Sequence, residues 1–181
     1  MKYHPIDRNL FIKNRAKFTA GMKPNSVALF NSNDIYPVSA DSTLPFAQHR
    51  DIFYLSGVDQ EESILLLFPD APYAHLKEIL FLKETNEHIA IWEGEKLTKE
   101  RAYEVSGIKS VMWLQDFHKT LNEVMTYAET MYINTNEHYR ASVETETREA
   151  RFVKWWKENY PAHKVEKSNP ILQRIRSIKE S

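Results

Sequence analysis

The stretch of residues 46–68 constrains the fold more than any other part of the chain. Large apolar side chains at residues 52–55 follow a run of polar residues and precede Ser56-Gly57. This order is typical of a short helix that begins at polar capping residues and ends at a glycine. After an acidic cluster at residues 59–62, residues 64–68 are apolar without alternation. Such a run indicates a strand that is covered on both faces, between two helical layers.

Helix and strand signals alternate along the rest of the chain. Capping residues and helical spacing predict helices that begin at Asp7 and Thr98, a helical face at residues 114–125 and an amphipathic helix at residues 146–160. The predicted strands are residues 27–30, 64–68, 79–82, 89–92, 108–112 and 132–133. The third and fourth flank a polar loop whose length suits a hairpin. This alternation predicts one layered α/β domain with a mixed sheet.

Residues 31–45 form a turn-rich segment with few apolar side chains. Its length is unusual for a plain connection in a compact domain, so a functional or subunit-contacting loop is one interpretation. The simpler interpretation is an exposed connection, and the sequence leaves both open.

The composition restricts the classes of partner and compartment. With 24 Lys and Arg against 25 Asp and Glu, the chain has no basic excess of the kind that binding to nucleic acid phosphates requires. It contains no cysteine, which excludes disulfides, thiolate zinc sites and cysteine nucleophiles. No apolar stretch reaches the roughly 18 residues of a membrane span, and the first residues lack the apolar run of a signal peptide. We therefore expect one cytoplasmic domain with neither nucleic acid nor a membrane as its partner.

Catalytic motifs are missing from the sequence. The seven histidines are scattered and form no His-Glu-x-x-His or His-x-His pair, and none of the four glycines builds a Gly-x-Ser-x-Gly elbow or a phosphate-binding loop. The carboxylates Glu61-Glu62 and Glu93 with Glu95 are candidates for an acid and a base. Acidic residues at helix starts and strand ends more commonly serve capping and solubility, so we expect no catalytic residue in this chain.

Four motifs, in order, give the chain a resemblance to a known family. Residues 46–57 are similar to a segment of the N-terminal domain of Xaa-Pro aminopeptidases, a non-catalytic domain shared with prolidase and creatinase relatives. Residues 39–42 stand where these proteins often carry Ser-Ala-Asp, and residues 88–94 look like their acidic-aliphatic-Trp-x-Gly segment. Residues 169–181 resemble the family's crossing into its catalytic domain.

The resemblance has departures within its central motif. Ala47 stands where the family usually has an arginine, and His49-Arg50 replaces a polar pair. Any role of that family arginine is therefore not carried over to this chain.

The resemblance implies a fold and a division of labour. It implies a layered α/β/α domain with a mixed sheet of about five to six strands and a ribonuclease H-like motif. Residues 1–167 would be the N-terminal non-catalytic domain, and residues 168–181 the linker and start of a catalytic metallopeptidase domain that the chain does not contain. The parent protein would remove the N-terminal residue that precedes proline, using two divalent cations, expected to be manganese. This chain alone would be inactive and would hold no cofactor.

Two substrate-binding candidates follow from the resemblance. Trp92 would wall the pocket for the substrate's N-terminal residue, often in a neighbouring subunit, since an indole supplies a large rigid apolar face. The alternative is that Trp92 ends a strand and packs into this domain's own core. Asp41 would make a polar contact near the substrate or to an arginine of the catalytic domain, although an aspartate before Ser-Thr is more commonly a turn or cap residue.

The expected partners also come from the resemblance. They are the protein's own C-terminal catalytic domain, further copies in a homo-oligomer (dimer or tetramer), and a peptide with proline at its second position. Arg176 and Lys179 would pair with the following domain or form a solvated helix end. Two other interpretations stay open: a stand-alone binding or assembly module of the same fold, and the N-terminal domain of a prolidase-type or creatinase-type relative.

Overall fold

The computed structural model describes residues 4–40, 42–86, 88, 91, 94–135 and 146–178. The described helices are α1 (Arg8–Thr19), α2 (Arg50–Ser56), α4 (Lys99–Ser106), α5 (Phe117–Met125), α6 (Arg148–Asn159) and α7 (Asn169–Ser177), with 3-10 turns η1 (Ala74–Leu76) and η2 (Leu114–Asp116). The strands are β1 (Ser26–Asn31), β2 (Pro37–Ser39), β3 (Ser42–Thr43), β4 (Ile64–Leu67), β5 (Glu78–Leu82), β6 (Ser110–Trp113), β7 (Thr130–Ile133) and β8 (Lys164–Lys167).

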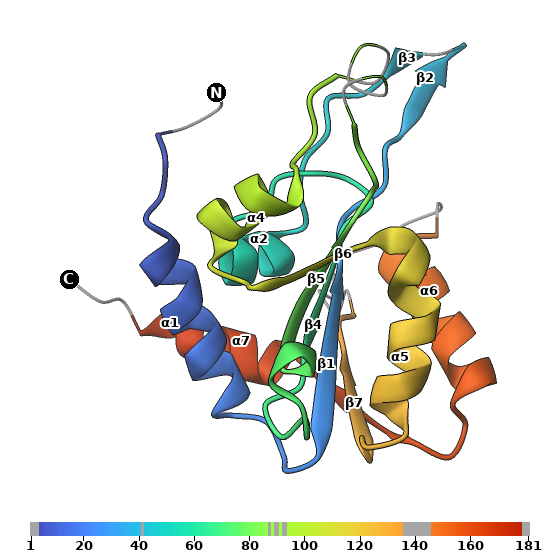
Figure 1. Cartoon of the computed structure of the whole chain (residues 1–181). Helices are drawn as coiled ribbons and strands as arrows, with labels where there is room; N and C mark the ends of the chain where they lie inside the picture. Colours follow the sequence, from blue (N-terminus) through green and yellow to red (C-terminus); the bar gives the residue numbers. More distant parts are fainter. Residues whose placement is uncertain are drawn as a thin grey trace.

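The large sheet is mixed and lies between two helical layers. Its six strands follow the order β6-β5-β4-β1-β7-β8, while β2 and β3 form a separate two-stranded ribbon. Helices α1, α2, α4 and α7 cover one face of the large sheet, and α5 and α6 cover the other (Figure 1). The predicted α/β/α layering and mixed sheet are confirmed.

The central strands β1 and β4 are buried along their whole length. In β1, Val27 and Leu29 join the apolar core under α5 and α6, whereas Ala28 and Phe30 join the core under α1, α2, α4 and α7. Residues 64–67 divide between the two cores in the same alternating way. Because both faces meet apolar neighbours, the sequence of β4 needs no polar positions, which explains its unbroken apolar run.

Strand direction places three connections at one end of the sheet. β4 is antiparallel to its neighbours β1 and β5, whereas β1 pairs parallel with β7, and β5 pairs parallel with β6. Consequently β1, β5 and β7 end at the same edge. The connections that follow them, residues 32–49, 83–98 and 134–147, leave from this edge, which we call the loop end (Figure 1).

The predicted helix ends are confirmed. The Asp7 carboxylate accepts a hydrogen bond from Asn9 N at 2.9 Å, and Thr98 Oγ1 accepts one from Arg101 N at 3.3 Å, so both residues cap helices as expected. Helix α2 ends at Gly57, which has a φ of 72°. A side chain with a Cβ is strained in that left-handed conformation, so glycine is the residue that stops α2 at least cost.

The predicted hairpin of residues 79–82 and 89–92 is wrong. Both edges of β5 are occupied, one by β4 and the other by β6, so no edge is left for a further strand. Most of residues 89–92 lie outside the described part of the chain. Strand β8 was not predicted, because three of its four residues are charged and it lies at an edge of the sheet.

Candidate functional site

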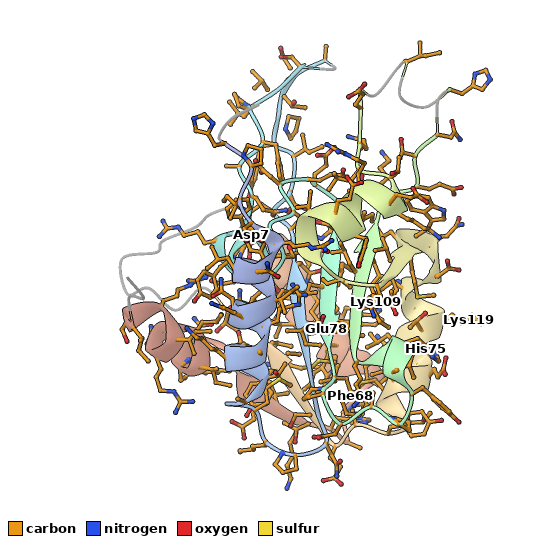
Figure 2. The ribbon with its side chains drawn as sticks, turned by 60° about the vertical axis from the view of Figure 1, so that its left-hand side comes forward. Asp7, Phe68, His75, Glu78, Lys109 and Lys119 are labelled. Carbon is orange, nitrogen blue, oxygen red and sulfur yellow. The ribbon has the colours of Figure 1, made fainter. Side chains whose placement is uncertain are left out.

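The loop end carries both predicted substrate-binding residues in its connections. Asp41 follows β2 and precedes β3, and Trp92 belongs to the connection between β5 and α4. Asp41 and Trp92 themselves lie outside the described residues. The ribbon of β2 and β3 extends from one end of the molecule. The described parts of the connection of residues 83–98 extend from the same end (Figures 1 and 2). In open α/β sheets, ligands commonly bind beyond the carboxyl ends of the strands.

Exposed apolar side chains belong to two of the connections that leave the loop end. Val38 of β2 is 58% exposed, Leu44 after β3 is 55% exposed, and Ile91 is 74% exposed. Ile35 and Tyr36 precede β2 and are also exposed. We call these five residues the loop-end apolar surface. Large apolar side chains grouped on a surface mark a contact site more often than scattered ones do.

Polar residues between positions 48 and 61 hold the connection of residues 83–98 in place. Gln48 Nε2 donates to the carbonyl oxygens of Val58 at 3.1 Å and of Gln60 at 2.8 Å. The Gln60 side chain in turn accepts a hydrogen bond from Leu97 N at 2.7 Å. Next to it, Lys96 forms a half-buried ion pair with Glu61. These contacts fix residues 96–97, four and five positions beyond Trp92, against the segment of residues 48–61.

The Glu61–Lys96 pair also has an electrostatic signature. Partial burial alone would raise the pKa of the Glu61 carboxyl, but the hydrogen bond and charge of Lys96 outweigh it and lower that pKa. Glu61 is therefore a charged anchor of the connection. Within the acidic cluster at residues 59–62, Glu61 thus has a structural contact.

Asp51 is the centre of a buried polar network behind the loop end. It is 8% exposed on α2 and accepts hydrogen bonds from Asn134 Nδ2 at 2.6 Å and from the Arg176 guanidinium. Asn134 Oδ1 accepts from Ser168 Oγ at 3.0 Å, at the start of α7. The network therefore joins the motif helix α2, the end of β7 and helix α7.

The structure places Arg176 differently from the prediction. The sequence left it either paired with a following domain or solvated at a helix end, whereas its guanidinium binds Asp51 and lies 4.9 Å from the centre of the Tyr54 ring. Arg176 is only one-third exposed. The contact spans 125 residues of sequence, so no local pattern could have revealed it. Lys179 lies outside the described residues.

Helix α7 belongs to the apolar core of the domain. Ile171, Leu172 and Ile175 are buried in the core that also contains residues of α1 and α2. The division at residue 168 stays a prediction, and the helix that begins beyond it packs on the same sheet as the rest of the chain.

Glu149 forms a second buried polar contact near the network. Its carboxylate accepts from Asn31 N at 3.0 Å and from Asn31 Nδ2 at 3.1 Å, which joins the start of α6 to the end of β1. Burial raises the pKa of Glu149 to about 8, the charge of Asp51 adds to this, and the hydrogen bonds from Asn31 and the charge of Arg148 oppose it. The carboxyl is therefore mostly protonated at neutral pH.

Arg15 holds two helix ends together and was not predicted from sequence. It is 1% exposed, and its Nη1 donates to the carbonyl oxygens of Leu55 at 2.9 Å and of Ser106 at 3.0 Å. These are the last turns of α2 and α4, where carbonyl groups lack helical partners. Arg15 Nε also lies 3.1 Å from Glu78, which Figure 2 shows beside α1. A buried arginine at helical spacing gives no signal that separates it from a solvated one.

Across residues 4–40, 42–86, 94–135 and 146–178, no three His, Asp or Glu side chains come together in a way that could hold a metal ion. Over the same part of the chain, every helix is too short or too polar to cross a bilayer.

Comparisons with known proteins agree on one relationship. A family model described as "Aminopeptidase P, N-terminal domain" matches residues 11–133. Xaa-Pro aminopeptidase of Escherichia coli is 26% identical over 138 residues, which is 76% of this chain and 31% of that protein. Human Xaa-Pro aminopeptidase 3 is 28% identical over 112 residues, which is 61% of this chain and 22% of that protein. The chain thus spans about a third or less of the length of these relatives.

Solved structures share the fold. Aminopeptidase P from E. coli superposes with a TM-score of 0.78 at 22% identity and matches 97% of this chain and 40% of that one. A structure from Bacillus anthracis, itself an aminopeptidase P candidate, has a TM-score of 0.85 at 24% identity and matches 97% of this chain and 41% of that one. At this level of identity the likeness concerns the fold.

Proposed function

The chain belongs to the aminopeptidase P N-terminal domain family, and on that premise we propose that it is the non-catalytic domain of an Xaa-Pro aminopeptidase-like metallopeptidase. Its working partner is a C-terminal catalytic domain of the same protein. That catalytic domain holds two divalent cations, manganese in the first instance, and cleaves the bond before a proline at the second position of a peptide. The observation that carries the proposal is the family match over residues 11–133, supported by relatives named Xaa-Pro aminopeptidase.

The domain's own contribution is to assemble the oligomer and to narrow access to the catalytic cleft. The loop-end apolar surface supports this role. Val38, Leu44 and Ile91 are exposed, and their burial against another protein surface would lower the free energy of the complex. The polar contacts of Gln60 and Glu61 support it as well, since they hold the connection that carries Trp92. A loop that shapes a binding pocket has to be positioned by a rigid scaffold.

Trp92 contributes an aromatic wall to the substrate pocket, and Asp41 a polar contact beside it. Both belong to connections that leave the loop end. A tryptophan buried at a contact commonly accounts for a large part of the binding free energy. Substrate recognition would therefore depend on this domain although the chemistry does not.

Replacement of Trp92 by alanine in the complete enzyme tests this role. The Trp92→Ala enzyme should keep its metal content and lose about tenfold or more in kcat/KM, mainly through a higher KM, because an apolar contact to the substrate is removed. Trp92→Phe should recover part of the loss. The matched control is Trp113→Phe on β6, which should leave KM unchanged. Equal kinetics for Trp92→Ala and the unmodified enzyme would refute the substrate contact.

An assembly module without peptidase partner is the second candidate, and the loop-end apolar surface favours it equally. The two proposals differ in what the gene encodes after Ser181: a metallopeptidase domain for the first, a stop codon for the second.

The length of the preferred substrate distinguishes a prolidase-type or creatinase-type parent from an aminopeptidase. The complete enzyme should cleave a tripeptide with proline at its second position in preference to an Xaa-Pro dipeptide.

A further inference from the structure

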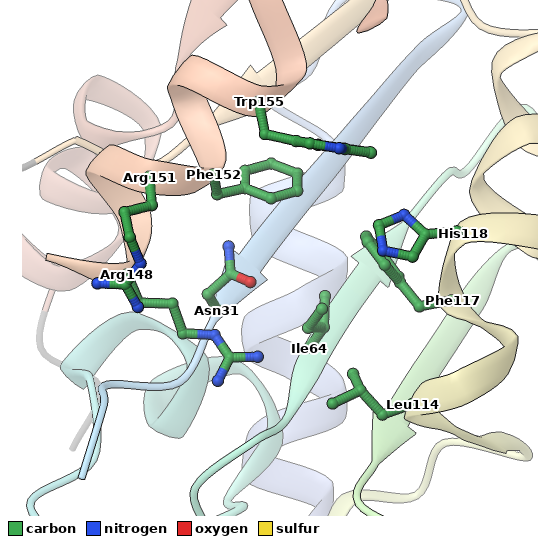
Figure 3. A pocket seen from close by; sticks show the side chains of 9 residues that line it. All are labelled: Asn31, Ile64, Leu114, Phe117, His118, Arg148, Arg151, Phe152 and Trp155. Carbon is green, nitrogen blue, oxygen red and sulfur yellow. The ribbon is translucent and has the colours of Figure 1, made fainter.

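Side chains of β1, β4, η2, α5 and α6 line a cavity of 330 Å³ (Figure 3). Helices α5 and α6 cover the sheet face opposite α1 and α7 (Figure 1). One side of the cavity is aromatic. The Phe152 and Trp155 rings of α6 lie 5.6 Å apart, and Trp155 also contacts the His118 ring of α5 at 5.0 Å. Phe117 of α5 packs against Phe152 at 6.4 Å. Rings that contact one another in this way form a wall that exists before any ligand arrives.

The two adjacent tryptophans of α6 have different surroundings, as their positions on a helix predict. Trp156 is 1% exposed and belongs to the core under α5 and α6. Trp155 points about 100° away on the helix and is only partly buried, with its indole lining the cavity. The partly exposed indole of Trp155 therefore forms part of the aromatic wall of the cavity.

The other side of the cavity is polar and cationic. Arg148 and Arg151 come from the first two turns of α6, and Figure 3 shows the Arg148 guanidinium extending below Asn31 toward Leu114. Asn31 is 2% exposed, and its side chain is fixed by the hydrogen bond to Glu149. An aromatic wall thus faces a positive charge across a space of ligand size.

Arg148 lies near three carboxylates and pairs with none of them. Arg151 pairs with Asp34 at 2.8 Å, and the nearby Glu62 pairs with Lys83 at 3.1 Å. Among the described residues, no carboxylate forms an ion pair or hydrogen bond with Arg148. Burial lowers the pKa of Arg148, and the charges of Asp34, Glu62 and Glu149 work against that effect without reaching its guanidinium.

We propose that this cavity is a binding site for a small carboxylate with an aromatic body. The guanidinium of Arg148 would form the charge-assisted hydrogen bonds to the carboxylate, and the rings of Phe152 and Trp155 would stack on the aromatic part. An arginine beside an apolar wall is the combination that recognises such a ligand, because a partly buried guanidinium gains most from an anion that water does not screen. The site lies on a different face from the assembly role of the loop end and does not depend on it.

A titration with 3-phenylpropanoate and with its neutral analogue 3-phenylpropan-1-ol tests the proposal. NMR spectra of the full chain should show that the acid shifts the Trp155 indole N–H and backbone signals of Phe117 and His118. The acid should bind about tenfold more tightly than the alcohol, a ratio that corresponds to about 1.4 kcal/mol. In Arg148→Gln this ratio should fall to about one, whereas the control Arg101→Gln, an exposed arginine on α4, should keep it.

Three results would overturn the proposal: no shift at Trp155, equal binding of acid and alcohol, or an acid preference that survives in Arg148→Gln. Unchanged signals elsewhere in Arg148→Gln exclude unfolding as the cause of a loss. The same chemistry is offered by a free metabolite and by the C-terminal residue of a peptide. Acetyl-glycyl-phenylalanine and its C-terminal amide distinguish these two sources. If the natural ligand is the C-terminus of a peptide, acetyl-glycyl-phenylalanine should bind more tightly than both its amide and 3-phenylpropanoate.

Discussion

At the residue scale, Asp51 shows how a motif that looks like a binding signature also holds the fold together. Its carboxylate is bound by Asn134 and Arg176, which lie 83 and 125 residues away in the sequence. A buried carboxylate costs free energy unless its lone pairs are satisfied, and these two donors satisfy both oxygens. The motif was recognisable from sequence, but this reason for its aspartate was not.

Replacing Asp51 should destabilise the domain markedly. Asp51→Asn removes the charge that Arg176 pairs with and leaves two donors competing for one amide oxygen, so the free energy of unfolding should fall by about 1–3 kcal/mol. Urea denaturation followed by circular dichroism measures the change. Glu104→Gln is the matched control, since it breaks an exposed pair with Arg101 and should cost less than about 0.5 kcal/mol. Equal losses in the two variants would show that the buried network contributes nothing special.

Glu149 should make stability depend on pH. Its pKa is about 8 in the folded protein against an ordinary value of 4.5 for glutamate, so folding takes up a proton at pH values between these two. The free energy of unfolding should then decrease as pH rises from about 5 to 8, by up to about 1.4 kcal/mol per pH unit.

The variant Glu149→Gln isolates that effect. It keeps an acceptor for Asn31 but removes the titrating group, so its stability should vary less between pH 5.5 and pH 8, roughly by the contribution of one proton. Histidines such as His49, whose pKa is lowered by burial, titrate in both proteins. Subtracting one profile of unfolding free energy against pH from the other therefore removes their contribution. Parallel pH profiles for the variant and the unmodified chain would mean that Glu149 is ionised in the folded state.

At the element scale, capping residues and apolar runs allowed most helices and central strands to be predicted. Asp7 and Thr98 begin helices, and Gly57 ends one, where the sequence indicates. The failures have a common physical cause. Strand pairing depends on which edges are free in three dimensions, so the hairpin at 79–82 could not be rejected before β4 and β6 were known to flank β5. The ribbon of β2 and β3 is fully exposed and gives no apolar pattern.

The connection after β5 should depend on Gln60. In Gln60→Ala the amide of Leu97 loses its acceptor and the turn at residues 60–62 loses a tie to the connection. Hydrogen exchange at residues 96–97 should speed up about tenfold or more, while protection of β1 and β4 stays unchanged, because local opening needs less free energy than global unfolding. Gln173→Ala, at an exposed position of α7, is the control and should leave residues 96–97 as protected as before. Unaltered exchange in Gln60→Ala would show that other contacts fix the connection.

At the scale of the whole molecule, the sheet brings connections that are distant in sequence to one end. The resemblance identified two of them through Asp41 and Trp92, and the parallel direction of β1, β5 and β7 explains why they leave from the same edge. Periodicity alone could not have predicted this arrangement, because it carries no information on strand order. It also could not have predicted the cavity, which is formed by side chains from five separate elements or their ends.

The loop-end apolar surface should promote association of the chain. Leu44→Gln replaces a 55% exposed leucine within that surface, and Leu10→Gln replaces a 47% exposed leucine on α1, away from it. Sedimentation velocity at increasing concentration should show weaker self-association for Leu44→Gln only, because burial of a leucine against a partner contributes roughly 1.5–3 kcal/mol. A monomer at every concentration, or an equal effect of both variants, would argue against an interface at the loop end.

The central claim is that this domain shapes a peptidase site whose chemistry belongs to another domain. The most direct measurement is an assay of the 181-residue chain with added Mn²⁺ and a tripeptide that has proline at its second position. A full-length Xaa-Pro aminopeptidase serves as the positive control. The account predicts no hydrolysis above the rate with Mn²⁺ alone. Turnover that rises in proportion to the concentration of the chain and persists after repurification would contradict it.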